Sequence, residues 1–185
     1  MTNATLVWWA LLCGVSIVNV LAWGASATVA HQRSRRVHPM TRQAVRLQVL
    51  LSAGYVLGCA YRSAFPVYDV GRQVMVDSWL SSVLVGRSVA TVAELCFAAQ
   101  WALLMHGLAR ASGDRLGLRL AQGVMPLILA AELCSWHAVL TTSNLGHVIE
   151  ESLWALCASA MVLGLARVWR RCRAEIRPAV AVAAL

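Results

Sequence analysis

Five long apolar runs constrain the fold of this chain more than any other feature. They cover about residues 5–30, 45–65, 82–108, 119–142 and 148–169. The hydrocarbon core of a bilayer is about 30 Å thick, and a helix crosses it with roughly 20 apolar residues. The sequence therefore predicts an all-α, polytopic integral membrane protein built as a bundle of five transmembrane helices.

The composition agrees with this class. Of the 185 residues, 59% are hydrophobic and only 13% are charged, which is too little charged surface for a soluble domain of this length. The five runs leave almost no chain for a separate soluble domain. We therefore expect one membrane domain over residues 1–185 that ends in a basic tail, 170–185.

Arginine alternates between the connecting segments. Segment 31–46 has five arginines and segment 109–119 has three, whereas the short segment 141–147 has none and the tail is again basic. Because cytoplasmic loops carry an excess of basic residues, this pattern predicts an N-terminus outside and a C-terminus in the cytoplasm. The compact chain and its arginine-only basic charge favour a bacterial cytoplasmic (inner) membrane.

Several function classes are excluded or disfavoured. All sixteen cations are arginine, so lysine Schiff-base chemistry, as in retinal pigments or pyridoxal enzymes, is excluded. The six cysteines form no CxxC pair, which disfavours a disulfide exchanger or a zinc ribbon. The pI near 10 fits cytoplasmic loop charge, so we expect the lipid bilayer and no nucleic acid as a partner.

Two glutamates lie deep in apolar runs, in VAELCFAAQW (92–101) and AAELCSWHAV (130–139). Glu94 is sixteen residues from Arg110, and Glu132 is thirteen from Arg119. At about 1.5 Å per residue, both lie roughly 20–24 Å from the cytoplasmic edge, near the midplane. A charge there costs at least about 2.5–3.5 kcal/mol, so such residues face a partner or water. A neutral glutamate that joins two helices by hydrogen bonds is the structural alternative.

A third polar group begins the fifth run, in HVIEESLW (147–154). His147, Glu150 and Glu151 are three and four residues apart, so they share one side of a helix, with Trp154 beneath them. Acids in the first turn of a helix also stabilise its dipole, and this alone would explain Glu150 and Glu151 without a functional role.

Other polar residues are candidates for a supporting role. Arg87 shares a face with Glu94, seven residues on, and serves as a counter-ion for an outer acid (Asp77, Glu150 or Glu151) or extends to the interface. Ser135 and Trp136 flank the face of Glu132. His137 points roughly 140° away from Glu132, which weakens a scheme in which both bind one ion.

Carboxylates with imidazoles are the ligand set of iron, manganese and zinc sites between helices. A divalent metal ion such as iron, manganese or zinc is therefore the cofactor that these residues indicate. The candidate ligands are Glu94, Glu132, His147, Glu150 and Glu151. The spacing supports this less well, because a di-iron bundle uses Glu-x-x-His pairs and this chain has only the reversed His147-x-x-Glu150. No HExxH, GxSxG or Walker loop is present.

Three functions remain open at this point. The first is an intramembrane, metal-dependent enzyme for a lipid-soluble substrate, with Glu94, Glu132 and Glu151 as catalytic residues. The second is a proton-coupled carrier or channel subunit, which with five spans requires a homo-oligomer or a membrane partner. The third is a structural or assembly subunit, in which small-residue faces such as 50–60 and 156–166 pack closely.

Overall fold

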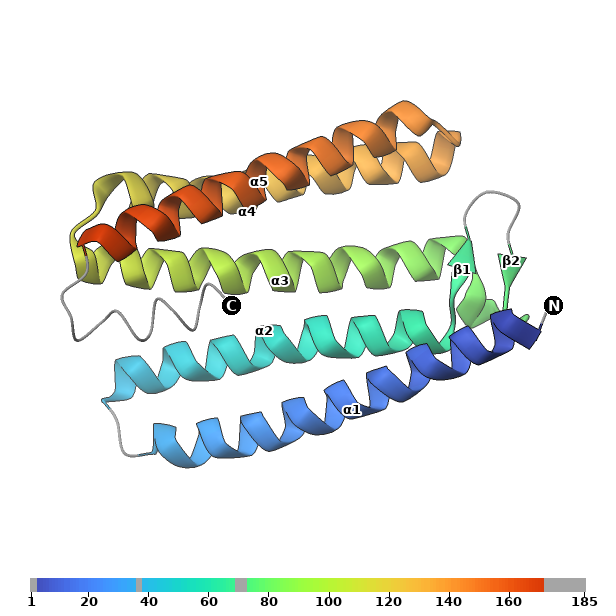
Figure 1. The fold of residues 1–185 in the computed structure, drawn as a ribbon, viewed down its shortest axis with the longest axis horizontal. Helices are drawn as coiled ribbons and strands as arrows, with labels where there is room; N and C mark the ends of the chain where they lie inside the picture. Colours follow the sequence, from blue (N-terminus) through green and yellow to red (C-terminus); the bar gives the residue numbers. More distant parts are fainter. Residues whose placement is uncertain (1–2, 36–37, 69–72, 172–185) are drawn as a thin grey trace. The chain divides into compact units, whose positions relative to one another are not determined.

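The structure, a computed structural model, describes residues 3–35, 38–68 and 73–171 (Figure 1). It contains five long helices: α1 (Asn3–Ser34), α2 (Pro39–Ala64), α3 (Val83–Ser112), α4 (Arg115–Thr141) and α5 (Asn144–Arg171). Each is long and apolar enough to cross a membrane, so the prediction of five such helices is confirmed. The direction in which they cross stays a prediction, and residues 172–185 of the basic tail lie outside the described residues.

The chain divides into two compact units, Met1–Phe97 and Ala98–Leu185, with the boundary inside α3. The first unit therefore holds α1, α2 and the first half of α3, and the second holds the rest of α3 with α4 and α5. The expectation of a single membrane domain over 1–185 stays a prediction.

In the first unit, α1 and α2 form an antiparallel hairpin joined by side-chain hydrogen bonds. The indole N–H of Trp23 donates to Oγ of Ser52 at 3.0 Å, and that of Trp9 donates to the carbonyl of Ser63 at 3.0 Å. At the turn, Arg42 donates from Nε to the carbonyl of Ser34 and from Nη2 to that of Arg35, both at 3.1 Å. Arg42 thus satisfies carbonyls that the end of a helix leaves without intrahelical partners.

The described part of the segment between α2 and α3 contains three short elements. β1 (Val67–Tyr68) pairs antiparallel with β2 (Gln73–Val74), and the 3₁₀ turn η1 (Trp79–Ser81) leads into α3. The hydroxyl of Tyr61 donates to the carbonyl of Leu80 at 2.6 Å, which ties the end of α2 to η1.

In the second unit, α4 and α5 run side by side as a hairpin (Figure 1). The buried residues of α4 are Gly117, Ala121, Val124, Ile128, Ala131, Glu132, Ser135 and Ala138. Those of α5 are Gly146, Glu150, Cys157, Met161, Gly164, Leu165 and Val168. Both sets recur mostly every three or four residues, so each forms one face of its helix. Two glutamates therefore belong to the buried faces of a hairpin whose other buried residues are mostly small or apolar.

Candidate cation site in the second unit

Glu132 of α4 and Glu150 of α5 are the central feature of the second unit. The two side chains belong to residues that are only 3% and 7% exposed. Their nearest carboxylate oxygens lie within 4.8 Å of one another. These two residues are called the carboxylate pair below.

His147 extends the carboxylate pair toward the start of α5. Its Nδ1 lies 3.3 Å from Oε2 of Glu150, three residues on, in an imidazole–carboxylate hydrogen bond. The His147 side chain is 41% exposed, whereas Glu150 is buried. The i, i+3 spacing in the sequence predicted that these two side chains share a helix face, and the structure joins them directly.

Gly146 determines how closely the two helices approach at this point. A Cβ on Gly146 would lie 2.7 Å from Cβ of Ala138 and 3.1 Å from the carbonyl oxygen of Cys134. Only glycine fits such an approach without moving a backbone. Because Glu150 follows Gly146 by four residues, it lies on the same face of α5 and is directed toward α4.

Ser135 adds a third polar group to the buried face of α4. It is completely buried, and its Oγ has no hydrogen-bond partner among the described residues. It follows Glu132 by three residues, so both lie on one face of the helix. A buried hydroxyl without a partner costs about 1–3 kcal/mol, which makes it an oxygen available to a ligand.

Two carboxylates at this separation have a definite electrostatic consequence. Two unit charges about 5 Å apart repel by about 3 kcal/mol at an effective dielectric constant of 20. A shared proton or a metal ion removes this repulsion. Metal–oxygen bonds of about 2.0–2.6 Å bring two ligand oxygens within about 5 Å of each other, so the spacing suits a divalent ion.

The other predicted residues of α4 and α5 lie around the carboxylate pair. Glu151 is exposed, because one residue rotates the side chain by about 100° from that of Glu150. His137 is also exposed, and Trp136 is partly buried. The catalytic and ligand roles assigned to these residues from the sequence stay predictions.

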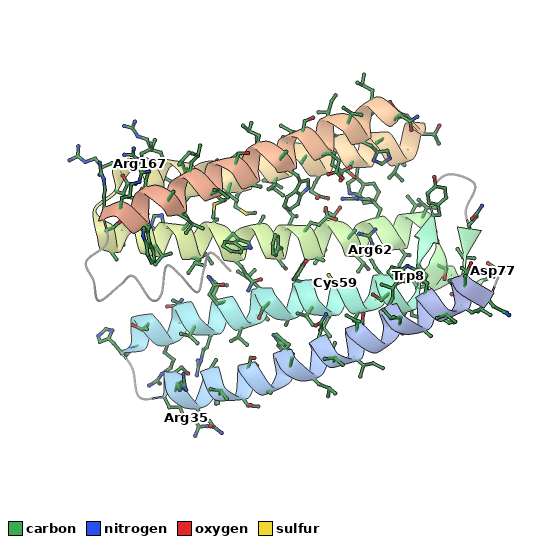
Figure 2. All side chains as sticks on the ribbon, in the orientation of Figure 1. Trp8, Arg35, Cys59, Arg62, Asp77 and Arg167 are labelled. Atoms are coloured by element: carbon green, nitrogen blue, oxygen red, sulfur yellow. The ribbon has the colours of Figure 1, made fainter. Side chains whose placement is uncertain are left out.

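Glu94 lies in the first unit, where arginines surround it. Nη2 of Arg87 lies 3.0 Å from Oε2 of Glu94, and Nη1 of Arg62 lies 3.8 Å from Oε1 (Figure 2 labels Arg62). The seven-residue spacing predicted that Arg87 and Glu94 share a face. The structure makes Glu94 a counter-ion of Arg87, whereas the sequence analysis had named only outer acids for that role.

Sequence reasoning missed one buried acid, Asp114, in the turn between α3 and α4. Its side chain is 1% exposed and lies 3.5 Å from Nε of Arg167 and 3.2 Å from Nη1 of Arg171, at the end of α5. Figure 2 shows Arg167 at that end of the helix. Two features of the sequence could have indicated this contact: a single acid in the arginine-rich segment 109–119, and two arginines one helical turn apart near the end of the fifth apolar run.

Comparisons with protein-family models, with curated proteins and with solved structures give no match. The chemistry of the site is therefore inferred from its own residues.

Proposed function

We propose that the carboxylate pair of Glu132 and Glu150 binds a divalent metal ion, and that the protein is an intramembrane enzyme acting on a lipid-soluble substrate. One observation carries the proposal: the two buried carboxylates lie within 4.8 Å of each other. Buried acids this close are stable together only with a positive charge or a shared proton.

The surrounding donors support a metal ion as that charge. His147 bonds to Glu150 and supplies an imidazole, and Ser135 supplies a buried hydroxyl oxygen. Imidazole with carboxylates suits zinc, iron and manganese. When bound, such an ion polarises a substrate oxygen or lowers the pKa of a bound water molecule.

The position of the pair supports a lipid-soluble substrate. Both glutamates belong to helices that are long and apolar enough to span a membrane. In the proposed topology, with the C-terminus in a bacterial cytoplasm, the arginine-bearing end of α5 is cytoplasmic. Glu150 lies in the second turn at the opposite end of α5, so the substrate would approach from the outer half of the bilayer.

Glu94 and Glu151 are less favourable metal ligands than the carboxylate pair. Glu94 already has arginine partners in the first unit, and Glu151 is exposed. A carboxylate held by guanidinium groups is a poorer ligand for a cation than one held beside another carboxylate.

The metal content of detergent-purified protein tests the proposal. We expect one iron, manganese or zinc ion per chain in the wild type and none in Glu132→Gln/Glu150→Gln. Asp77→Asn, which removes an exposed acid of the first unit, is the control and should keep the metal. No metal in the wild type, or equal metal in the double variant, would refute the metal site.

A proton relay is the second candidate function. It is favoured because the exposure of three neighbouring titratable side chains falls from one to the next. His147 is partly exposed, Glu150 is buried and Glu132 is the most buried of the three. Linked titratable groups of this kind carry protons in membrane proteins. Proton uptake into reconstituted vesicles that stops in both His147→Phe and Glu132→Gln, in a protein without metal, would favour the relay.

If the carboxylate pair has a purely structural role, the glutamine and leucine variants should give a third set of results. Glutamine keeps the hydrogen-bonding capacity of glutamate, whereas leucine does not. If the glutamine double variant behaves as wild type in every assay while Glu132→Leu/Glu150→Leu fails to accumulate, the pair serves helix packing.

A further inference from the structure

One face of α1 carries a heptad pattern along the length of the helix. Residues on this face recur at alternating intervals of four and three, which is the spacing of a helix that packs along a partner helix. They are Trp8, Leu12, Val15, Asn19, Ala22, Ser26, Val29 and Arg33, and all except the half-buried Leu12 are exposed. This set of residues is called the α1 seam below.

Asn19 is a polar residue at the centre of the α1 seam. It lies sixteen residues from Asn3 and fifteen from Ser34, the two ends of a helix that is long and apolar enough to cross a membrane. Within the described residues its exposed side chain makes no hydrogen bond. A polar group without a partner costs several kcal/mol in the hydrocarbon core, so this amide indicates a partner outside the chain.

The opposite side of α1 has no such requirement. Thr28 lies nine residues from Asn19, which is about 180° around the helix at about 100° per residue. Its exposed hydroxyl donates to the carbonyl of Ala25 in the same helix at 2.6 Å, so its hydrogen bond is made within α1. The need for a partner is therefore confined to the side of α1 that carries the seam.

A hollow of about 510 Å³ adjoins one end of the α1 seam. Ser26, Val29 and Arg33 of the seam line it, together with Thr41 and Val45 of α2. Protein interiors contain few voids of this size, and a helix that packs on the seam would cover this one. Arg33 lies at the end of α1 predicted to be cytoplasmic, where its guanidinium group can extend into water.

We propose that the α1 seam binds a second copy of this chain, with Asn19 of one protomer hydrogen-bonded to Asn19 of its partner. Copies in one membrane share one orientation, so a two-fold axis along the membrane normal brings equal residues of two α1 helices together. An asparagine amide has both donors and an acceptor, which makes it complementary to itself. Lipid tails can cover the apolar residues of the seam, but they offer this amide no hydrogen bond.

Energy transfer between donor-labelled and acceptor-labelled copies of the full chain, reconstituted in phosphatidylcholine vesicles over a range of protein-to-lipid ratios, tests the proposal. We expect a dimer in the wild type. Asn19→Val removes the amide and should weaken the dimer about tenfold, the effect of a hydrogen bond between transmembrane helices. Asn19→Gln keeps the donors and the acceptor and should retain most of the affinity. Thr28→Val, the matched control, should dimerise as the wild type does.

A second pair of variants tests the packing of the seam. Ala22→Leu adds bulk between Asn19 and Ser26, and should also weaken the dimer about tenfold. Ala10→Leu makes the same change at an exposed alanine that, like Thr28, lies nine residues from Asn19, and should leave the dimer unchanged. Thermal unfolding of each variant in detergent, at dilutions that keep the chain monomeric, checks that the fold is retained.

Two outcomes would overturn the proposal. A wild-type chain that stays monomeric at the highest protein-to-lipid ratio would show that the seam does not bind a second copy. A dimer that responds to the seam variants no more than to Thr28→Val and Ala10→Leu would have its interface on another part of the protein.

Discussion

Two buried acidic groups in the second unit have opposite surroundings. Asp114 lies at the turn before α4, within 3.5 Å of Arg167 and 3.2 Å of Arg171. Glu132 lies far along the same helix, with the carboxylate of Glu150 within 4.8 Å. The first group contains its own compensating charge. The second brings two carboxylates together, with Nδ1 of His147 3.3 Å from Glu150, and it is there that we propose a bound cation.

The arginines of Asp114 also differ from it in exposure. Arg167 and Arg171 are 42% and 52% exposed, whereas the carboxylate is almost fully buried. Their guanidinium groups can remain partly hydrated while they neutralise Asp114, which lowers the desolvation cost of the contact. The contact joins the turn between α3 and α4 to the end of α5, so we assign it to the stability of the second unit.

The largest effect on stability is expected from Arg167→Gln/Arg171→Gln. This double change leaves the buried carboxylate of Asp114 without the two guanidinium groups beside it, and should lower the free energy of unfolding by about 3 kcal/mol, the lower limit for a buried charge that loses its partner. Thermal unfolding in detergent, with Arg119→Gln/Arg170→Gln as the control of equal charge, measures the change. A loss below about 0.5 kcal/mol, as at ordinary surface positions, would contradict the assigned role.

The next prediction compares two adjacent acids. Glu150→Gln should weaken metal binding about a hundredfold, which corresponds to about 2.7 kcal/mol, because it removes a ligand. Glu151→Gln removes the same charge from an exposed side chain and should have a much smaller effect. Calorimetric titration of metal-free protein with zinc or manganese measures both, and equal losses would show that Glu151 is also a ligand.

In metal-free protein Glu150→Gln removes the like charge beside Glu132 and keeps an oxygen that can accept a hydrogen bond from His147, so it should change the free energy of unfolding by less than about 1 kcal/mol. A loss as large as that expected at the Asp114 contact would contradict the contrast between the two acidic groups.

A smaller effect is expected from Gly146→Ala. The added Cβ would meet the backbone of α4 at Cys134 and Ala138, which should cost about 2 kcal/mol and move Glu150 away from Glu132. Gly123→Ala is the matched control, because its Cβ would meet nothing within 4 Å. Alanine in a helix interior should stabilise that variant by up to about 1 kcal/mol. Unfolding and metal titrations of both variants make the comparison.

The smallest effect is expected from Ser135→Ala. Removal of a buried hydroxyl that lacks a partner should leave the metal-free protein unchanged or raise its stability by up to about 1 kcal/mol. If Ser135 is a ligand, metal affinity should fall several-fold at the same time. A loss of stability without metal would mean that the hydroxyl has a structural role.

The sequence predicted the helices well because bilayer thickness requires long apolar runs, and all five appear as helices. It also predicted correctly which residues of one helix share a face. The pairs Arg87 with Glu94 and His147 with Glu150 follow from helix periodicity alone, and both are in contact.

Contacts between helices were harder to predict. Glu150 and Glu151 are adjacent, and only the packing of α5 on α4 decides which of them is buried. The burial of Asp114 depends on its contacts with Arg167 and Arg171, which lie more than 50 residues away in the sequence. The hollow beside the α1 seam depends on how α1 packs on α2, which periodicity does not contain.

The turn between α4 and α5 has a consequence for the synthesis of this protein. Only Thr142 and Ser143 connect the two helices, and Thr142 adopts the left-handed conformation, with φ 53° and ψ 35°. Closing so short a loop costs little chain entropy, so the two helices can pair as soon as both have been made, before the rest of the fold is complete. Glu132 and Glu150, on the buried faces of this hairpin, would then come together early and without help from α1 or α2.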